Sequence, residues 1–524
     1  MDRLTMFHVS RPARLMVHNE MHRVRSISML SCLLCVAVGA CTQGVRVFDP
    51  DGGDGPDAFA PPPDAGPSRR VFVDDGIDPD IERRFDEAGA SPAAPPSLVY
   101  PEDGTLIPPN LRGVDFHFHP SGFQTFEITL SQHGEPAVVV YTWCTPMGTG
   151  CTFQPGTEIW EELARRRPDG PFEVRIRGLA GDLASTPSEP IHVELADEPI
   201  LGGIYFWTVE PPSIRRYEFG LARRSSELFL SGAEEGSCIG CHALSRDGSR
   251  IAVGVAGPSG EPGSRIYDVA SRTMVLDAPV PGDLVSYGPT GDMLVSGAMT
   301  DAPVRFFSAD GALLHDLGVV GRGGDWSADG EHAVYAAHLL SGPSELHLVT
   351  RDGDAWSEPR VIPTPTTDAE AFPAFAPDAH WISYVGTDTA NPTRSLLAVL
   401  HVADEQVVHL RRAAVDDDVT FARWNPNPYS HRGRRIFWLT FSSRRDYGLL
   451  SDANRQIWMA AFDPEADPED PSRPAFRIPA QTYGVGNFIA QWALSVRRQP
   501  CETDADCPDG EECHDGFCRP RGPE

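Results

Sequence analysis

The sequence lacks a hydrophobic run long enough to cross a membrane. Its longest apolar stretch, Met29 to Ala40, has only twelve residues and is interrupted by Ser31, whereas a spanning helix needs about 20 apolar residues. Basic residues are also scarce, with 44 Lys and Arg against 74 Asp and Glu, and the formal net charge is −30. Because binding to phosphate backbones needs a cationic surface, this balance predicts that nucleic acid is not a partner.

The sequence also lacks the common motifs of hydrolases and transferases. It carries no Gly-x-Ser-x-Gly elbow, no HExxH and no phosphate-binding loop, so it offers no hydrolase or transferase chemistry. With 49 Gly and 49 Pro among 524 residues, a mainly helical chain is disfavoured and a coiled coil is excluded. The length suits two to four domains.

The short apolar run is typical of an export signal. Arg23 and Arg25 precede it, and it ends in Val38-Gly39-Ala40-Cys41, a small-residue cleavage site. This ending resembles the lipobox of bacterial lipoproteins, which implies cleavage before Cys41 and lipidation of its thiol. Residues 1–41 are therefore predicted to be a signal peptide and lipobox, with an ordinary secretory signal as the alternative. Because Thr42 rather than Asp follows the anchor, the outer membrane is favoured, with membrane contact through the lipid alone.

Two segments of different composition follow. Residues 42–96 are rich in Asp, Pro, Gly and Ala and are predicted to form a disordered tether, because they cannot bury enough apolar surface to offset the entropy of ordering. Residues 97–199 contain short alternating segments, such as Phe172 to Ile176, which predict a β-sandwich. This segment resembles a fibronectin type III or immunoglobulin-like module. His117 and His119 are interpreted as exposed strand histidines.

An internal repeat fills residues 200–498 and predicts the architecture. Each copy has an aromatic or apolar strand end, a Ser/Pro-Asp-Gly turn and a β-rich strand, as in Trp326-Ser327-Ala328-Asp329-Gly330. The spacing of about forty to fifty residues suits a four-stranded propeller blade. Five visible turns predict six blades, the sixth formed from Asn487 to Ala493 together with strands near Ile204 to Trp207 and Ile214 to Phe219.

These turns resemble the TolB-like family of propellers. Thr440-Phe441-Ser442-Ser443, followed by Gln456-Ile457-Trp458-Met459, is similar to that family's phenylalanine-serine-serine segment and its next strand. The resemblance implies an all-β fold with a six-bladed propeller. The family's periplasmic prototype is a protein-binding component of an envelope complex, but a shared propeller does not transfer that role.

One motif carries chemistry: Cys238-Ile239-Gly240-Cys241-His242 matches the attachment pattern of c-type haem. Cys238 and Cys241 would form the thioethers, and His242 would be the proximal iron ligand. Three alternatives stay open, namely a local disulfide between Cys238 and Cys241, a zinc half-site and thioredoxin-like redox chemistry. The sequence does not choose a distal ligand among its candidates, which are Met293, Met299, Met459, His332, His338 and His431.

The other cysteines fall into two local groups and predict disulfides of an exported protein. Cys144 and Cys151 are expected to close a short loop. Residues 499–524 form a small disulfide module whose members are Cys501, Cys507, Cys513 and Cys518. Four cysteines allow three pairings, and the sequence does not decide between them.

Together these features predict a cell-envelope lipoprotein whose propeller is a binding scaffold. The first hypothesis adds one covalent haem c, for electron transfer or haem-based sensing with an envelope protein or redox partner. The alternative is a non-haem scaffold that binds protein or glycan and contains a structural CxxC disulfide. No other catalytic residue is expected, and a redox activity is the one enzymatic role left open.

Overall fold

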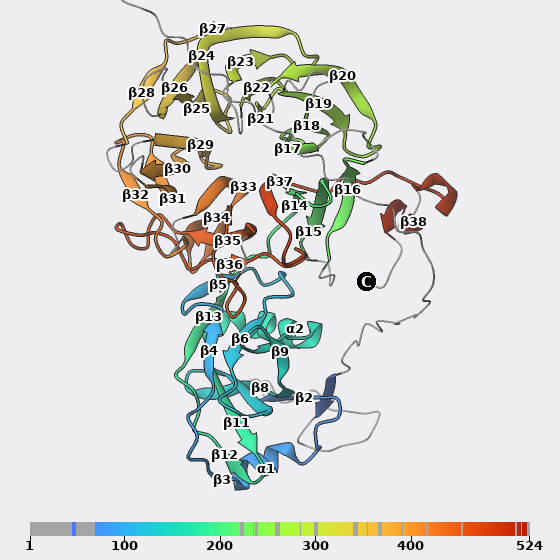
Figure 1. Cartoon of the computed structure of the whole chain (residues 1–524), viewed down its shortest axis with the longest axis vertical. Helices are drawn as coiled ribbons and strands as arrows, with labels where there is room; N and C mark the ends of the chain where they lie inside the picture. Colours follow the sequence, from blue (N-terminus) through green and yellow to red (C-terminus); the bar gives the residue numbers. More distant parts are fainter. Residues whose placement is uncertain are drawn as a thin grey trace, which may run out of the picture. The chain divides into compact units, whose positions relative to one another are not determined.

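A computed structural model shows an almost entirely β-stranded chain (Figure 1). It describes residues 45–48, 69–220, 225–233, 235, 239–256, 262–282, 284–297, 302–338, 344–353, 355–364, 369–388, 391–414, 418–451, 454–508, 511–514 and 516–520. The predicted signal peptide and lipobox with Cys41, and the haem candidate Cys238, lie outside these residues. The described residues belong to one unit, Gly44–Glu524.

The N-terminal part is a β-sandwich of two sheets, as predicted. In strand β11 (Phe172–Ala180), Phe172, Val174 and Ile176 are buried and alternate with charged residues, so one face enters the core. The larger sheet contains β1 (Val45–Phe48), β2 (Arg70–Asp74), β3 (Gly89–Ala90), β5 (Thr105–Ile107), β7 (Thr125–Gln132), β8 (Glu135–Trp143), β11, β12 (Leu183–Ala184) and β13 (Ile191–Leu195). The smaller contains β4 (Ser97–Tyr100), β6 (Phe116–His119), β9 (Thr145–Met147) and β10 (Gly150–Phe153).

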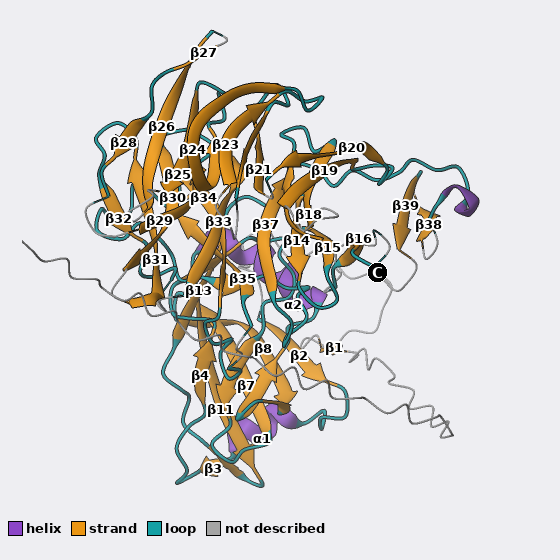
Figure 2. Cartoon of the chain, turned by 45° about the horizontal axis from the view of Figure 1, so that its top comes forward, coloured by secondary structure: helices purple, strands orange, loops and turns teal. Residues whose placement is uncertain are grey.

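The helices of the sandwich are few, as Figure 2 shows. They are α1 (Ile81–Glu87), α2 (Thr157–Arg166) and the short 3-10 turn η1 (Arg167–Asp169). Three pairs in the larger sheet are parallel, namely β2 with β8, β12 with β3 and β13 with β5. The two-sheet sandwich is therefore confirmed, whereas the finer likeness to fibronectin or immunoglobulin modules stays a prediction.

The predicted tether of residues 42–96 is wrong at residues 45–48, which form β1, and from Arg69 onward. Strand β2 pairs with β8, with Arg70 opposite Val138, and helix α1 buries Ile81 and Phe85. These few apolar residues stand among acidic ones, so they carry little local signal, and the tertiary contact with the larger sheet orders them. The folded sandwich thus includes residues 45–48 and the residues from Arg69 onward, rather than beginning at Ser97.

Six four-stranded blades follow, which confirms the six-bladed propeller. The first blade contains β14 (Gly203–Thr208), β15 (Ser213–Glu218), β16 (Glu227–Ser231) and β37 (Asn487–Ala493), and the second contains β17 (Ile239–Leu244), β18 (Arg250–Ala256), β19 (Pro262–Asp268) and β20 (Met274–Pro281). The third contains β21 (Leu284–Tyr287), β22 (Met293–Ser296), β23 (Ala302–Phe307) and β24 (Leu313–Trp326). The fourth contains β24 again with β25 (His332–His338), β26 (Ser344–Asp352) and β28 (Arg360–Ile362), and the short β27 (Ala355–Trp356) pairs with β26.

The last two blades are β29 (Ala369–Phe375), β30 (Trp381–Asp388), β31 (Asn391–His401) and β32 (Val407–His409), then β33 (Val419–His431), β34 (Arg434–Ser443), β35 (Gln456–Phe462) and β36 (Phe476–Arg477). The third and fourth blades share the 14-residue strand β24. Its first half pairs with β23, where Asp316 faces Arg305, and its second half pairs with β25, where Trp326 faces Ala333.

The blade built from both ends of the propeller is also confirmed. Strand β37 pairs antiparallel with β14, so that Trp492 lies opposite Ile204. The Thr208 hydroxyl donates a hydrogen bond of 2.9 Å to Asn487 Oδ1 across this pair. Because segments from the two ends of the propeller share one sheet, their pairing closes the ring.

The repeated turns follow from side-chain hydrogen bonds. In the turn before β18, Asp247 accepts from the Ser245 hydroxyl at 2.6 Å and from the Ser249 amide at 3.0 Å. Gly248 adopts φ +69°, a conformation that glycine reaches without a Cβ clash. The repeat therefore encodes a hairpin turn, as predicted.

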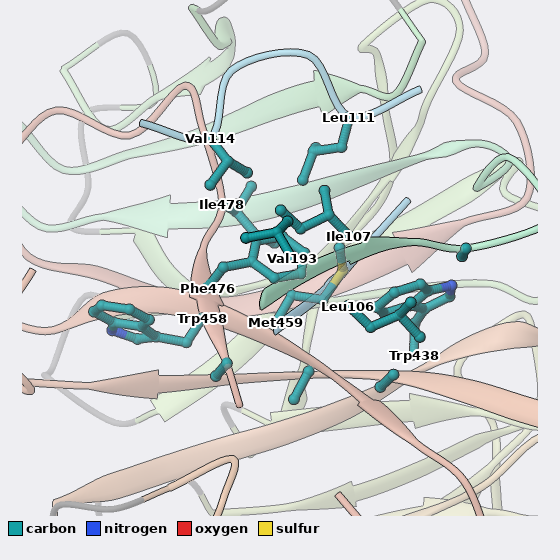
Figure 3. Packing of buried hydrophobic residues seen from close by; sticks show 14 of the residues in the cluster. Leu106, Ile107, Leu111, Val114, Val193, Trp438, Trp458, Met459, Phe476 and Ile478 are labelled. Atoms are coloured by element: carbon teal, nitrogen blue, oxygen red, sulfur yellow. The ribbon is translucent and has the colours of Figure 1, made fainter. Parts of the chain in front are cut away.

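An apolar cluster joins the sandwich to the last blade (Figure 3). Leu106, Ile107 and Val193 from the sandwich pack with Trp438 and Phe476 from the propeller. Aromatic and aliphatic burial of this kind is the main favourable term in holding two folded parts together. The sandwich is thus a packed part of the described unit.

The interpretation of His117 as an exposed strand histidine is wrong. His117 is fully buried, while His119 is exposed as expected. The His117 ring contacts Tyr447 of the last blade, with ring centroids 4.5 Å apart. Burial comes from the propeller, which the local strand pattern does not reveal.

The C-terminal module contains η2 (Asp504–Asp506), β38 (Glu511–His514) and β39 (Phe517–Pro520). Its disulfides are Cys501–Cys513 and Cys507–Cys518, and Cys144–Cys151 closes the predicted loop. An ion pair between Arg272 and Glu511 links the module to the second blade. Across the part of the chain that the structure describes, no helix has both the length and the apolar character to span a membrane.

Candidate functional site

A cavity of about 90 Å³ lies where the inner strands of the propeller meet. The inner strand of every blade contributes to its wall. These strands are β17, β21, β24, β29, β33 and β37, and they supply Ala243, Ser286, Asp325, Ala374, Arg423 and Gln491. We call the polar ones, Ser286, Asp325, Arg423 and Gln491, the axial polar layer. Contributions from all six blades place the cavity on the propeller axis.

An apolar layer lies two residues earlier on the same strands. Cys241, Leu284, Phe421 and Ile489 form one buried cluster, against which Phe372 packs. The Phe372 and Phe421 ring centroids are 4.1 Å apart. Since residues i and i+2 of a strand face the same side, the apolar layer underlies the polar one. The cavity therefore has an apolar floor on the axis.

The floor is built with unusual backbone geometry. Phe372, Phe421 and Ile489 have φ of +53°, +51° and +55°, a region that non-glycine residues rarely adopt, least of all β-branched ones. Register shifts mark bulges in β29 and β33 at these positions. In β24 the matching residue is Gly323, where a Cβ would come within 2.8 Å of Phe372 Cα. Such local strain is characteristic of functional sites.

Arg423 is the most exceptional residue of the polar layer. It is only 8% exposed, and its single side-chain hydrogen bond among the described residues runs from Nη1 to the carbonyl of Ala422, at 2.8 Å. Burial lowers the pKa of Arg423, while Asp325 and Cys241 act in the opposite direction. Because a guanidinium stays charged in proteins, Arg423 brings to the cavity wall a positive charge that makes one hydrogen bond within the described residues.

Asp325 does not satisfy Arg423 directly. Its Oδ1 accepts a 2.5 Å hydrogen bond from the Ser286 hydroxyl, and its Oδ2 accepts a 2.9 Å bond from the amide of Phe375. No ion pair joins Asp325 to Arg423 within the described ranges. Asp325 thus links the inner strands β21, β24 and β29 by hydrogen bonds. It leaves the Arg423 guanidinium available to a ligand.

Two further side chains add donors to the cavity. Arg246 donates from Nε to the Tyr287 carbonyl at 3.2 Å and from Nη2 to the Trp326 carbonyl at 2.6 Å. Asn425 is fully buried, and its Nδ2 has no hydrogen-bond partner in the described structure. Both line the cavity, so the wall carries the amide of Asn425 and the guanidinium groups of Arg246 and Arg423.

Of the sequence-predicted haem residues, the structure describes Cys241 and His242, and neither lines this cavity. Cys241 points into the axial apolar layer, whereas the Nε2 atom of His242 lies 2.9 Å from the Tyr205 carbonyl of the first blade. Nδ1 is 3.3 Å from the Gly240 carbonyl. Burial lowers the pKa of His242 to about 4, which favours the neutral ring.

This arrangement does not fit a haem iron. A neutral imidazole binds metal through a ring nitrogen that carries a free lone pair, and both ring nitrogens of His242 lie against backbone carbonyls. Of the distal-ligand candidates, Met293 and Met459 are fully buried in other cores. Met299 lies outside the described residues, and no described candidate belongs to the apolar layer around Cys241.

Sequence reasoning missed Arg423, Asp325 and Asn425. A signal existed, because Arg423 is the sole charged residue in the stretch Val419 to Trp424, whose other residues are apolar except Thr420, immediately before a recognised turn. A charged residue in a buried strand is a candidate for function. Only the tertiary structure, however, shows that Asp325 and Asn425 reach the same cavity.

Neither a family model nor a curated protein matches the chain. Among solved structures, TolB from Acinetobacter baumannii is similar over 59% of this chain and 79% of its own, at 13% identity and TM-score 0.38. A DUF4784 family protein from Bacteroides caccae is similar over 75% and 98%, at 10% identity and TM-score 0.34. An oligogalacturonate lyase in complex with manganese is similar over 57% and 84%, at 12% identity and TM-score 0.33.

TolB is thus among the similar structures, in line with the sequence resemblance. Likenesses this distant carry no argument about what the chain binds. The propeller itself rests on the strand pairing of its six sheets.

Proposed function

We propose that the chain is a cell-envelope scaffold, anchored by lipid on Cys41, whose propeller binds a partner at the axial cavity. The observation that carries the proposal is the convergence of all six inner strands on a cavity that holds the under-bonded Arg423. Buried polar groups without partners call for an explanation, and a ligand supplies one. The disulfides support export, and the lipobox resemblance supports outer-membrane anchoring with an envelope protein as partner.

The test places a photo-crosslinking amino acid at the cavity in the native host. Leu494 lines the cavity and is 46% exposed, so its replacement should report a bound partner without disturbing the core. Leu313, 56% exposed at the start of β24, is the matched control. We expect a discrete crosslinked product from position 494 and none from position 313. Equal labelling at both positions, or none at either, would contradict the proposal.

Haem c is not part of this proposal, because the geometry of His242 does not fit an iron ligand. The haem of the first hypothesis stays a prediction. A pyridine haemochrome spectrum of protein exported with a cytochrome c maturation system decides it, and a colourless protein would leave the non-haem scaffold.

A further inference from the structure

From the donor set of the cavity we infer that its ligand presents a carboxylate group, which Arg423 receives. The inference rests on the proposed function and narrows it, since it names the chemistry that the axial cavity recognises. It is argued from the hydrogen bonds that the cavity residues make and from those they lack.

Two residues of the cavity wall carry N–H donors that no described residue accepts. Arg423 has five N–H groups, and one hydrogen bond, to the Ala422 carbonyl, is all that the described residues take from it. Asn425 Nδ2 adds a buried amide without an acceptor. The single carboxylate in the wall, Asp325, has each oxygen occupied by another strand. An acceptor group of a ligand can take these remaining donors.

The charge balance favours an anion of single charge. Arg423 and Arg246 bring two positive charges to the wall, and Asp325 brings one negative charge, which leaves a surplus of one. A carboxylate matches that surplus, and its two oxygens match the planar fork of a guanidinium. A dianionic phosphate would need a second uncompensated cation, and a cationic ligand would be repelled by Arg423.

The position of Arg423 restricts how the ligand enters. The apolar layer beneath it contains Phe372, Phe421 and Ile489, so a carboxylate cannot pass further along the axis without losing its hydration in an apolar environment. The ligand is therefore held in the cavity above the apolar layer, with its charged group innermost. Trp424 and Trp492 line the same cavity and offer apolar contact to the rest of the ligand.

Two sources supply such a group, a free organic acid or the C-terminal carboxylate of a protein chain. The experiment uses the full chain and ¹⁹F NMR with three probes. These are 3,3,3-trifluoropropanoate, N-trifluoroacetyl-dialanine with a free C-terminus, and the same dipeptide with a C-terminal amide. We expect the wild-type protein to bind at least one carboxylate probe, and to bind the free dipeptide at least tenfold more tightly than its amide if it binds dipeptides.

The comparison of the probes distinguishes a free organic acid from the C-terminal carboxylate of a protein chain. A free dipeptide that binds tenfold more tightly than trifluoropropanoate indicates a chain terminus, whereas equal or weaker binding indicates a free acid. Absence of binding by both carboxylate probes, or an amide that binds as well as the free dipeptide, overturns the inference. These comparisons need no variant, so they hold even where a substitution prevents folding.

Variants then test whether Arg423 is the residue that contacts the carboxylate. Arg423→Gln should weaken carboxylate binding by about tenfold or more, as expected for loss of a charge-assisted bond. Arg83→Gln, at an exposed arginine of helix α1, should leave binding unchanged. Undiminished binding by Arg423→Gln would show that another group holds the anion and would overturn the assignment.

Thermal unfolding gives an independent readout. A buried cation without an ion-pair partner costs stability, so Arg423→Gln should melt at the same temperature as the wild type or higher. A structural role in an ion pair predicts a large fall instead, and that result would overturn the inference. Specific crosslinking at position 494 without carboxylate preference would leave the proposed function standing and remove this inference alone.

Discussion

At the scale of single residues, the turns show where the sequence departs from its own repeat. The turns before β18 and β25 have Gly248 and Gly330 at positive φ, whereas the turn before β30 has Ala379 at φ +59°. The Asp of this turn still accepts a hydrogen bond, from the His380 amide to Asp378 Oδ1 at 3.0 Å. The turn therefore keeps its shape although its residue is poorly suited to it.

Replacing Ala379 with glycine should stabilise the protein. A Cβ in the left-handed region costs about 1–2 kcal/mol, and glycine removes that cost while losing some entropy, so we expect a gain of about 0.5–1 kcal/mol. Chemical denaturation measures the change. Ala328→Gly is the matched control, because Ala328 is exposed in the equivalent turn before β25 without a positive φ, and it should be neutral or destabilising.

Two buried histidines should make stability depend on pH. Burial lowers the pKa of both His242 and His117 to about 4, below the unfolded value of about 6.5. The unfolded chain therefore binds more protons between these values, so stability is complete above about pH 6.5 and falls as the pH drops toward 4. Each histidine contributes a slope of up to about 1.4 kcal/mol per pH unit within that window.

Denaturation midpoints at pH 7 and pH 5 check this dependence. His242→Gln should reduce the difference between the two midpoints, whereas His192→Gln should not, because His192 is exposed. Equal midpoints for the wild type at both pH values would contradict the burial of these two rings.

At the scale of elements, the pair of β14 and β37 is the joint that closes the ring. Asn487 is buried in this joint. It accepts from Thr208 at 2.9 Å and donates to the Val485 carbonyl at 3.0 Å. The joint thus depends on side-chain bonds as well as on the backbone ladder.

Asn487→Ala should destabilise the propeller by about 1–3 kcal/mol, because it leaves the buried Thr208 hydroxyl without its acceptor. Unfolding by urea, followed by tryptophan fluorescence, measures the loss. Asn427→Ala is the control at a half-buried asparagine of β33, with an expected change of within about 0.5 kcal/mol. A loss of similar size in both variants would argue against a special role for this joint.

At the scale of the whole molecule, the sandwich and the propeller share one apolar cluster. The long hairpin that ends β33 reinforces it, since the Arg432 amide donates to Asp197 at 2.7 Å and its Nε donates to Glu194 at 2.6 Å. The sequence shows this hairpin only as a longer turn. The extra length of the hairpin lets Arg432 reach Asp197 and Glu194 near the end of the sandwich.

The anchoring proposal predicts where the folded chain resides. Cys41→Ser should move the protein from the membrane fraction to the soluble periplasmic fraction and abolish labelling by radioactive palmitate, because a single lipidation site is proposed. Cell fractionation and labelling measure both effects. A variant that stays in the membrane fraction would show that another part of the chain makes the attachment.

The sequence by itself determined the repeated architecture. The Ser-Asp-Gly turns, the blade closed by Asn487 to Ala493 and the local disulfide Cys144–Cys151 were all readable, because turns, strand alternation and short loops depend on neighbouring residues. The CxxCH motif was readable too, but it did not predict that the His242 ring lies against the Tyr205 carbonyl.

Only the tertiary structure decided the rest. It ordered β2 and α1 against the sandwich, buried His117 beneath Tyr447, and brought Arg423, Asp325 and Asn425 from different strands to one cavity. These outcomes depend on contacts between residues far apart in the chain, which no local pattern encodes. The physical reason is that a propeller builds its site from one short piece of every blade, so the site exists only once the ring has closed.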